Sequence, residues 1–219
     1  MKTPTTGFET RIEQTRIQQL SVQPDGVLWL VALGKPVTQG SMSMRGGKVV
    51  HSAGSDLHEW RNTITREALR TVGQRWQPVD APLRIDAMFT VPAPRTAPAG
   101  VFVCEGGNPR MAPMGPPDTD KLLRAAQDAL SPHQRGREGS RFLLVKDDSR
   151  FVDSSAGKTF PAPGHTHPWA LSQPGVVIRV APVGGVDPMP ASTLGEPEGP
   201  PQRVAELEDQ CLRRRGVNR

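Results

Sequence analysis

Two groups of aspartates are the residues with the most chemistry to offer. The first lies in PPDTDKLLRAAQDAL, residues 116–130, and includes Asp118 and Asp120. The second is the adjacent pair Asp147 and Asp148 in the sequence KDDS. Carboxylate oxygens from two chain segments form the hard ligand set that suits Mg²⁺ or Mn²⁺. An ion held there would polarise a phosphoryl oxygen and lower the pKa of a bound water, as phosphodiester hydrolysis requires.

The first group is predicted to open a helix over residues 119–130. At about 100° per residue, Asp120, Arg124 and Asp128 fall on one exposed stripe, with leucines and alanines on the opposite arc. A structural interpretation also exists, because aspartate in a first turn is favoured by the helix dipole and Asp120 with Arg124 is an ordinary i, i+4 pair. The second group argues for a cation, since adjacent aspartates at a strand end repel each other.

The overall charge favours a polyanionic partner. The formal charge is +5 and the pI is near 9.8, which fits nucleic acid first and an anionic membrane surface second. No run approaches the roughly 18 apolar residues that span a bilayer, and the N-terminus lacks the apolar region of a secretion signal. We therefore expect a cytoplasmic protein without a membrane partner. Cys104 and Cys211 are isolated and are predicted to be free thiols.

The surrounding pattern predicts a small α+β domain. Apolar runs and alternation predict strands over 27–33, 83–91, 141–145 and 175–180, with a short one near 150–152. The alternation in 83–91 predicts a half-buried strand. A further helix is expected from Asp56 to Gly73. The expected architecture is a two-layer α/β arrangement, with a small mixed sheet packed against two helices.

Composition divides the chain into three parts. Residues 1–25 are predicted to be a flexible arm, 26–182 the folded domain, and 183–219 a tail that is disordered or carries a short helix over 203–215. The 23 prolines and 22 glycines imply long stretches that are neither helix nor central strand. The Gly- and Ser-rich stretch 34–54 is predicted to be a mobile basic loop.

The combined motifs resemble a known family. PDTDKLLRAAQDAL, followed by VKDDSRFV and a later lysine, is similar to the RusA family of phage and prophage Holliday junction resolvases, whose pattern is roughly PDxDNLxKxxxDAL, then DDxxV and a lysine. GKPVTQGS and the helix with Trp60 and Arg61 also look like the actinophage members. The resemblance covers roughly residues 28–181. It implies a homodimeric, Mg²⁺-dependent endonuclease, with Mn²⁺ as a substitute, that makes paired symmetric nicks in branched DNA in the bacterial host cytoplasm during phage recombination, replication or repair.

The resemblance also implies roles for individual residues. Asp118, Asp120 and Asp148 match the family's essential aspartates, as catalytic residues and metal ligands. Asp147 matches the less decisive first member of the DD pair, as a further ligand. Arg124 stands where the family usually has a functional lysine and would stabilise transition-state charge. The expected DNA contacts are Lys121, which replaces the usual asparagine, with Lys146, Lys158, Lys35, Arg45 and Lys48.

Other interpretations stay open. The chain could be a non-catalytic DNA-binding protein whose acidic cluster only caps a helix, or a nuclease acting on flaps and forks. AGKT at 156–159 is not a Walker loop, because Val152 stands where the first glycine is required. Lys158 is either an active-site lysine or a surface charge. His165 and His167 lack a third soft ligand and are predicted to be loop residues.

Overall fold

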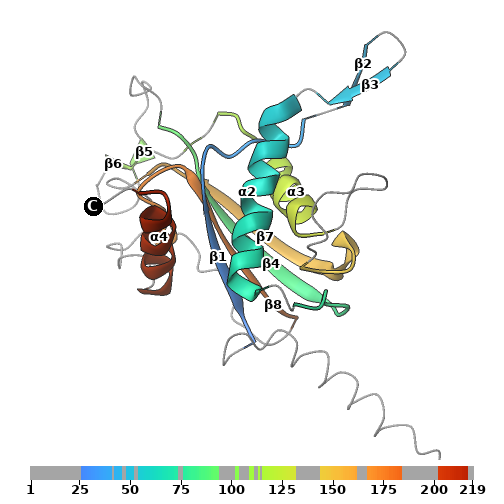
Figure 1. Cartoon of the computed structure of the whole chain (residues 1–219). Helices are drawn as coiled ribbons and strands as arrows, with labels where there is room; N and C mark the ends of the chain where they lie inside the picture. The colour runs from blue at the N-terminus through green and yellow to red at the C-terminus, as the bar shows by residue number, and fades with distance from the viewer. Residues whose placement is uncertain are drawn as a thin grey trace, which may run out of the picture.

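A four-stranded sheet in the order β1-β8-β4-β7 forms the centre of the molecule (Figure 1). The strands are β1 (Leu28–Leu33), β4 (Leu83–Thr90), β7 (Phe151–Thr159) and β8 (Gly175–Pro182). β8 runs antiparallel to β1 and β4, whereas β4 and β7 are parallel. The predicted mixed sheet and α+β class are therefore confirmed. The computed structural model describes residues 26–40, 42–45, 48–51, 54–73, 76–93, 102–103, 109–110, 113, 115–131, 144–161, 167–183 and 202–216.

Two predicted helices cover one face of this sheet. They are α2 (Gly54–Val72) and α3 (Thr119–Leu130), and both begin close to where helical spacing of apolar residues begins in the sequence. Trp60 and Ile64 of α2 and Leu122 of α3 are buried in the main core. The strands contribute the alternate residues that point to this face, among them Leu30, Ile85, Phe89 and Ile178.

A third helix, α4 (Gln202–Arg214), packs on the other face. The sequence predicted either a short helix or an unfolded segment here. Its Val204 and Leu212 join a second apolar cluster with Trp169 and Met88. The prediction that strand 83–91 is half-buried was therefore wrong, because β4 lies inside the sheet and is covered on both faces. Two helices were expected against the sheet, and the described residues form three.

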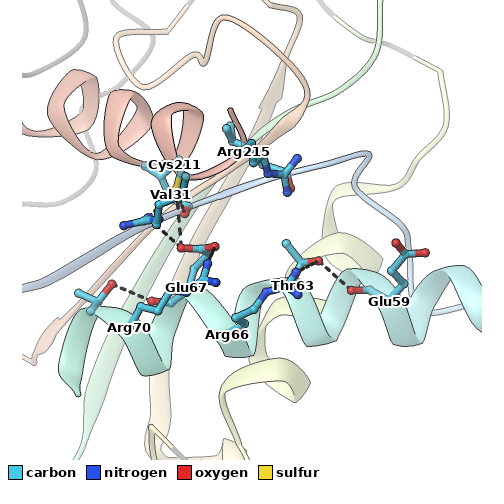
Figure 2. Close-up of polar contacts among 11 residues, drawn as sticks. Val31, Glu59, Thr63, Arg66, Glu67, Arg70, Cys211 and Arg215 are labelled. Atoms are coloured by element: carbon cyan, nitrogen blue, oxygen red, sulfur yellow. Dashed lines mark hydrogen bonds and ion pairs between the residues drawn. The ribbon is translucent and has the colours of Figure 1, made fainter. Parts of the chain in front are cut away.

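The same helix closes the free edge of β1. The Cys211 thiol donates to the Val31 carbonyl at 3.1 Å, and the Arg215 guanidinium donates to the Leu33 carbonyl. Arg214 donates to Glu67 of α2 at 2.9 Å, so the two helices meet across the strand edge (Figure 2). Burial, followed by the nearby Glu67 charge, raises the pKa of the Cys211 thiol. Edge carbonyls that would otherwise face solvent are thus satisfied by α4.

The β7 strand is longer than expected. Only residues 150–152 were predicted to be extended, yet the strand spans nine residues and includes AGKT. Its sequence, FVDSSAGKT, is mostly small or polar and has little intrinsic β propensity. The extended conformation of β7 is therefore stabilised by the backbone hydrogen bonds of its parallel pairing with β4. Of the strand predicted over 141–145, Val145 forms a single bridge with Val79, and residues 141–143 lie outside the described ranges.

A hairpin replaces part of the predicted basic loop. Its strands are β2 (Met42–Arg45) and β3 (Lys48–His51), which pair in antiparallel register. Figure 1 shows the hairpin projecting from the body at the end where α2 and α3 begin. A second small hairpin joins β5 (Phe102–Val103) to β6 (Pro109–Arg110). The predicted arm, 1–25, and residues 184–201 of the predicted tail lie outside the described residues.

Candidate functional site

Asp118 stands at the N-cap position of α3, yet its carboxylate does not cap the helix. Its backbone is extended, with φ −70° and ψ 135°, and within the described chain its side chain makes no capping hydrogen bond. Oδ2 instead accepts from Lys121 Nζ at 2.6 Å. That hydrogen bond, with the nearby Lys121 and Lys158 charges, holds the pKa of Asp118 below its usual value. A helix-capping hydrogen bond therefore does not explain why an aspartate stands at this position.

Lys158 holds the turn that precedes Asp118. It extends from β7, and its Nζ donates to the carbonyls of Gly115 at 2.6 Å and Pro117 at 3.0 Å. A strand distant in sequence thereby fixes the entry into α3. The sequence predicted Lys158 to be either an active-site lysine or a surface charge. In the structure its ammonium group is hydrogen-bonded to backbone carbonyls. Its ammonium group lies beside the first acidic pair and supports the backbone there.

The predicted acidic stripe on α3 is split between solvent and the helix interface. Asp120 and Arg124 are exposed, as expected. Asp128 is buried and pairs with Arg61 of α2, so the prediction that it lies on the exposed face was wrong. Each four-residue step along a helix drifts by about 40°. Two such steps carry position 128 round to α2, where its carboxylate neutralises a partly buried arginine.

Several predicted DNA contacts lie at this end of the molecule. The backbone amide of Gln39 donates to the Lys121 carbonyl at 3.2 Å, which places Gln39 beside the first turn of α3. Lys35 in that segment is exposed. Arg45 and Lys48 are paired in register at the tip of the β2–β3 hairpin, which projects from the same end. The first acidic pair is thus flanked by basic chain segments.

The second acidic pair forms a short 3₁₀ turn, η2 (Asp148–Arg150). Asp147 caps it, since its Oδ1 accepts from the Ser149 amide at 3.0 Å. Hydrogen bonds from Ser149 lower the pKa of Asp147. Asp148 is half-buried at the start of the turn. The first aspartate therefore has a structural task, in keeping with the lesser role that the resemblance implies for it.

A carboxylate that the sequence analysis missed holds this turn. Asp80 accepts from Lys146 Nζ at 2.9 Å and from Arg150 Nε at 2.8 Å. These contacts, Lys146 first, lower the pKa of Asp80 to about 2. Lys146, predicted to contact DNA, is engaged by Asp80. Arg150 lies two residues after the DD pair, so its closeness in sequence could have marked it as a partner of the turn. Asp80 lies in the stretch QPVDAP, which carries no motif that predicts this contact.

The first acidic pair lies at the N-terminus of α3, and the chain that leads into the second pair is bonded to the C-terminus of the helix. Leu130, the last residue of α3, accepts backbone hydrogen bonds from Leu144 and Val145, just before KDDS. The turn η2, which carries Asp148, also contacts α3. Among the described residues, no group of three or more His, Cys, Asp or Glu side chains is arranged to hold a metal. The common cage expected from both pairs is therefore not assembled by the described side chains.

The first pair alone fits the demands of Mg²⁺. This ion is commonly bound by one or two carboxylates and keeps waters or substrate phosphates in its other positions. Asp118 and Asp120 are exposed at the start of one helix, and the hydrogen bond from Lys121 lowers the pKa of Asp118 further below neutral pH. Their oxygen chemistry suits a hard cation. Of the two histidines noted in the sequence, His167 lies in a buried turn, where its Nδ1 accepts from the Trp169 amide at 3.0 Å, and His165 lies outside the described residues.

Comparisons with known proteins leave the family open. Neither a scan against protein-family models nor a search of curated proteins found a match to the chain. The RusA-like resemblance thus stays a prediction carried by the motifs. None of the helices in the described ranges is both long and apolar enough to cross a bilayer.

Proposed function

We propose that this chain is a Mg²⁺-dependent, structure-selective DNA endonuclease of the RusA type. It nicks branched DNA, four-way junctions above all, and acts as a homodimer because two symmetric nicks require two sites related by one axis. The observation that carries the proposal is the Asp118 carboxylate. It occupies a capping position without capping, and it stays exposed and ionised beside Lys121 and a turn anchored by Lys158.

The residues of the α3 N-terminus divide the work. Asp118 and Asp120 hold the cation, which supplies positive charge against the scissile phosphate and activates water when bound. Lys121 pairs with Asp118 and lowers the pKa of its carboxyl group. Arg124, exposed one turn further along, offsets the negative charge that develops on the phosphate. Lys35, with the hairpin residues Arg45 and Lys48, provides positive charge for the DNA backbone.

Asp148 is assigned a supporting part in the same reaction. It is half-buried in η2 and belongs to the turn next to the C-terminal end of α3. Its match to an essential aspartate rests on the KDDS motif. Its contribution is tested by substitution, and Asp147 provides the matched neighbour.

A junction-cleavage assay with Mg²⁺ tests the proposal. The wild-type protein should nick a four-way junction, and Asp120→Asn should abolish nicking while preserving or tightening junction binding, because a negative charge near phosphate is removed. Asp56→Asn is the matched control, since Asp56 also lies in the first turn of an exposed helix end. Undiminished cutting by Asp120→Asn would overturn the assignment of this site.

Two alternatives have distinct outcomes in the same assay. A non-catalytic DNA-binding protein, favoured by the lack of an assembled three-carboxylate group among the described residues, would bind junctions without cutting them. A nuclease for flaps or forks would cut those substrates as fast as four-way junctions. The basic segments beside α3 are compatible with DNA binding in each case.

A further inference from the structure

The KDDS turn is held at both ends by one carboxylate. Lys146 precedes the two aspartates and Arg150 follows them, and each donates to a different oxygen of Asp80, at 2.9 and 2.8 Å. Asp80 comes from the loop before β4, about 70 residues away in sequence. The side chains of Lys146 and Arg150 are 57% and 36% exposed, so these pairs bring little fold stability. Their geometric effect is larger, because they fix Lys146 and Arg150 on either side of residues 147–149.

Backbone contacts reach both flanks of the turn. The Val79 amide donates to the Leu144 carbonyl at 3.0 Å, and the Lys146 amide donates to the Val79 carbonyl at 3.0 Å. On the second flank, Phe151 begins β7 and pairs with Leu83 of β4. Within η2, the Arg150 amide donates to the Asp147 carbonyl and the Phe151 amide donates to the Asp148 carbonyl. The Arg150–Asp80 pair is the side-chain contact that ties the second flank to the loop before β4.

We propose that Asp80 is a positioning residue for the nuclease site, which orients the turn carrying Asp148 through paired contacts with Lys146 and Arg150. The effect on cleavage rests on the proposed function. The two contacts of Asp80 with Lys146 and Arg150, which we call the Asp80 clamp, are present in the protein without metal. Asp80 does not touch substrate in this role. Two contacts to one carboxylate define an orientation that a single pair would leave free to rotate.

The test measures turn order and cleavage separately. Variants Asp80→Asn and Asp80→Glu are compared with wild type by amide hydrogen exchange over residues 144–152, without divalent ions or DNA. Asp80→Asn should raise exchange of the Arg150 and Phe151 amides about tenfold, because turn opening becomes easier. Asp80→Glu should recover part of the protection. Asp153→Asn is the matched control, since Asp153 is an exposed, arginine-paired aspartate on β7.

Cleavage kinetics then test the positioning role. Asp80→Asn should lower the junction-nicking kcat about tenfold with KM nearly unchanged, since misplacement costs rate more than binding. Asp80→Glu should restore part of the rate, and Asp153→Asn should leave it unchanged. Unaltered exchange in Asp80→Asn, or altered exchange with unaltered kcat, overturns the inference. If the wild-type protein cuts no DNA, the proposed function and the positioning role fail together, and exchange still reports whether the clamp exists.

Discussion

The two edge strands of the sheet differ in their exposure to solvent: β1 is covered by helices, and the start of β7 is exposed. At β1, α4 and α2 meet over the strand edge, and the polar groups there are largely buried, with Glu67 7% and Cys211 4% exposed. At β7, residues 152–154 are exposed and Val152 reaches 59%. Carboxylates pair with basic side chains at both edges.

The two edges therefore differ in whether their charged side chains are buried in the fold or are free to exchange partners with solvent and ligands. At the β1 edge the Glu67 side chain is buried although its partner Arg214 is 40% exposed, so removing the basic partners would leave a carboxylate with reduced solvation. Exposed pairs near β7, such as Asp118–Lys121, are exchangeable with water and salt. A ligand or phosphate can therefore compete for them at little cost. The proposed site at the N-terminus of α3 contains a pair of this exposed kind.

The largest expected effect is on the closed edge. Leu212→Ala should lower the free energy of unfolding by about 2–5 kcal/mol, because Leu212 is buried between α4 and the sheet. Val152→Ala on the open edge should change it by less than about 0.5 kcal/mol. Urea unfolding followed by tryptophan fluorescence measures both. A comparable loss for Val152→Ala would mean that the β7 edge is covered as well.

A smaller loss is expected for a polar contact that docks α4. Glu208 accepts from the Ser172 amide at 2.7 Å and from its hydroxyl at 2.6 Å. Glu208→Ala should cost about 1–3 kcal/mol, because both donors lose a buried acceptor. Glu206→Ala, at an exposed position of the same helix, serves as the control and should be nearly neutral in the same unfolding experiment.

Substitutions in the KDDS turn should spare stability and affect cleavage. Asp148→Asn is expected to lower the nicking rate about a hundredfold, and Asp147→Asn less than about tenfold, since Asp147 caps the turn and an asparagine oxygen can still accept that bond. Both variants should unfold at the wild-type urea midpoint. Equal losses of activity would contradict the division of roles between the two aspartates.

The smallest expected effect is the response of the Asp80 clamp to acid. Because the pKa of Asp80 is lowered from 3.8 to about 2, its contribution to stability is fully present above pH 3.8 and is lost as the pH falls through 2. Wild type should thus exceed Asp80→Asn in unfolding midpoint at pH 5, and the two should converge near pH 2. A constant offset across this range would show that another group carries the effect. The difference should stay small, because the Asp80 side chain is 30% exposed and its partners Lys146 and Arg150 are more so.

Local pattern predicted much of the fold. The run VLWLVAL, the apolar spacing after Asp56 and the stretch GVVIRV became β1, α2 and β8, because burial of one face or of a whole strand leaves a periodic signature in the residues themselves. The helix over 119–130 was predicted with its exact bounds. The strand β7 was underestimated, because its small polar residues become extended through pairing with β4.

The candidate site was only partly readable. Asp118, Asp120 and KDDS were identified by residue type and spacing, and the structure places Lys158 and Lys121 beside Asp118. The arrangement of the two pairs relative to α3, and the engagement of Lys146 by Asp80, depend on segments far apart in sequence. No local pattern encodes such contacts.

By itself, the sequence determined which residues can bear charge near a phosphate and where the main helices and strands begin, since both follow from side-chain chemistry and short-range periodicity. Only the tertiary structure decided that Asp128 serves α2 and that Asp118 stays exposed. It also decided that α4 closes one edge of the sheet. The physical reason is that a carboxylate's role depends on its burial and on its partners, and both are set by packing across the chain.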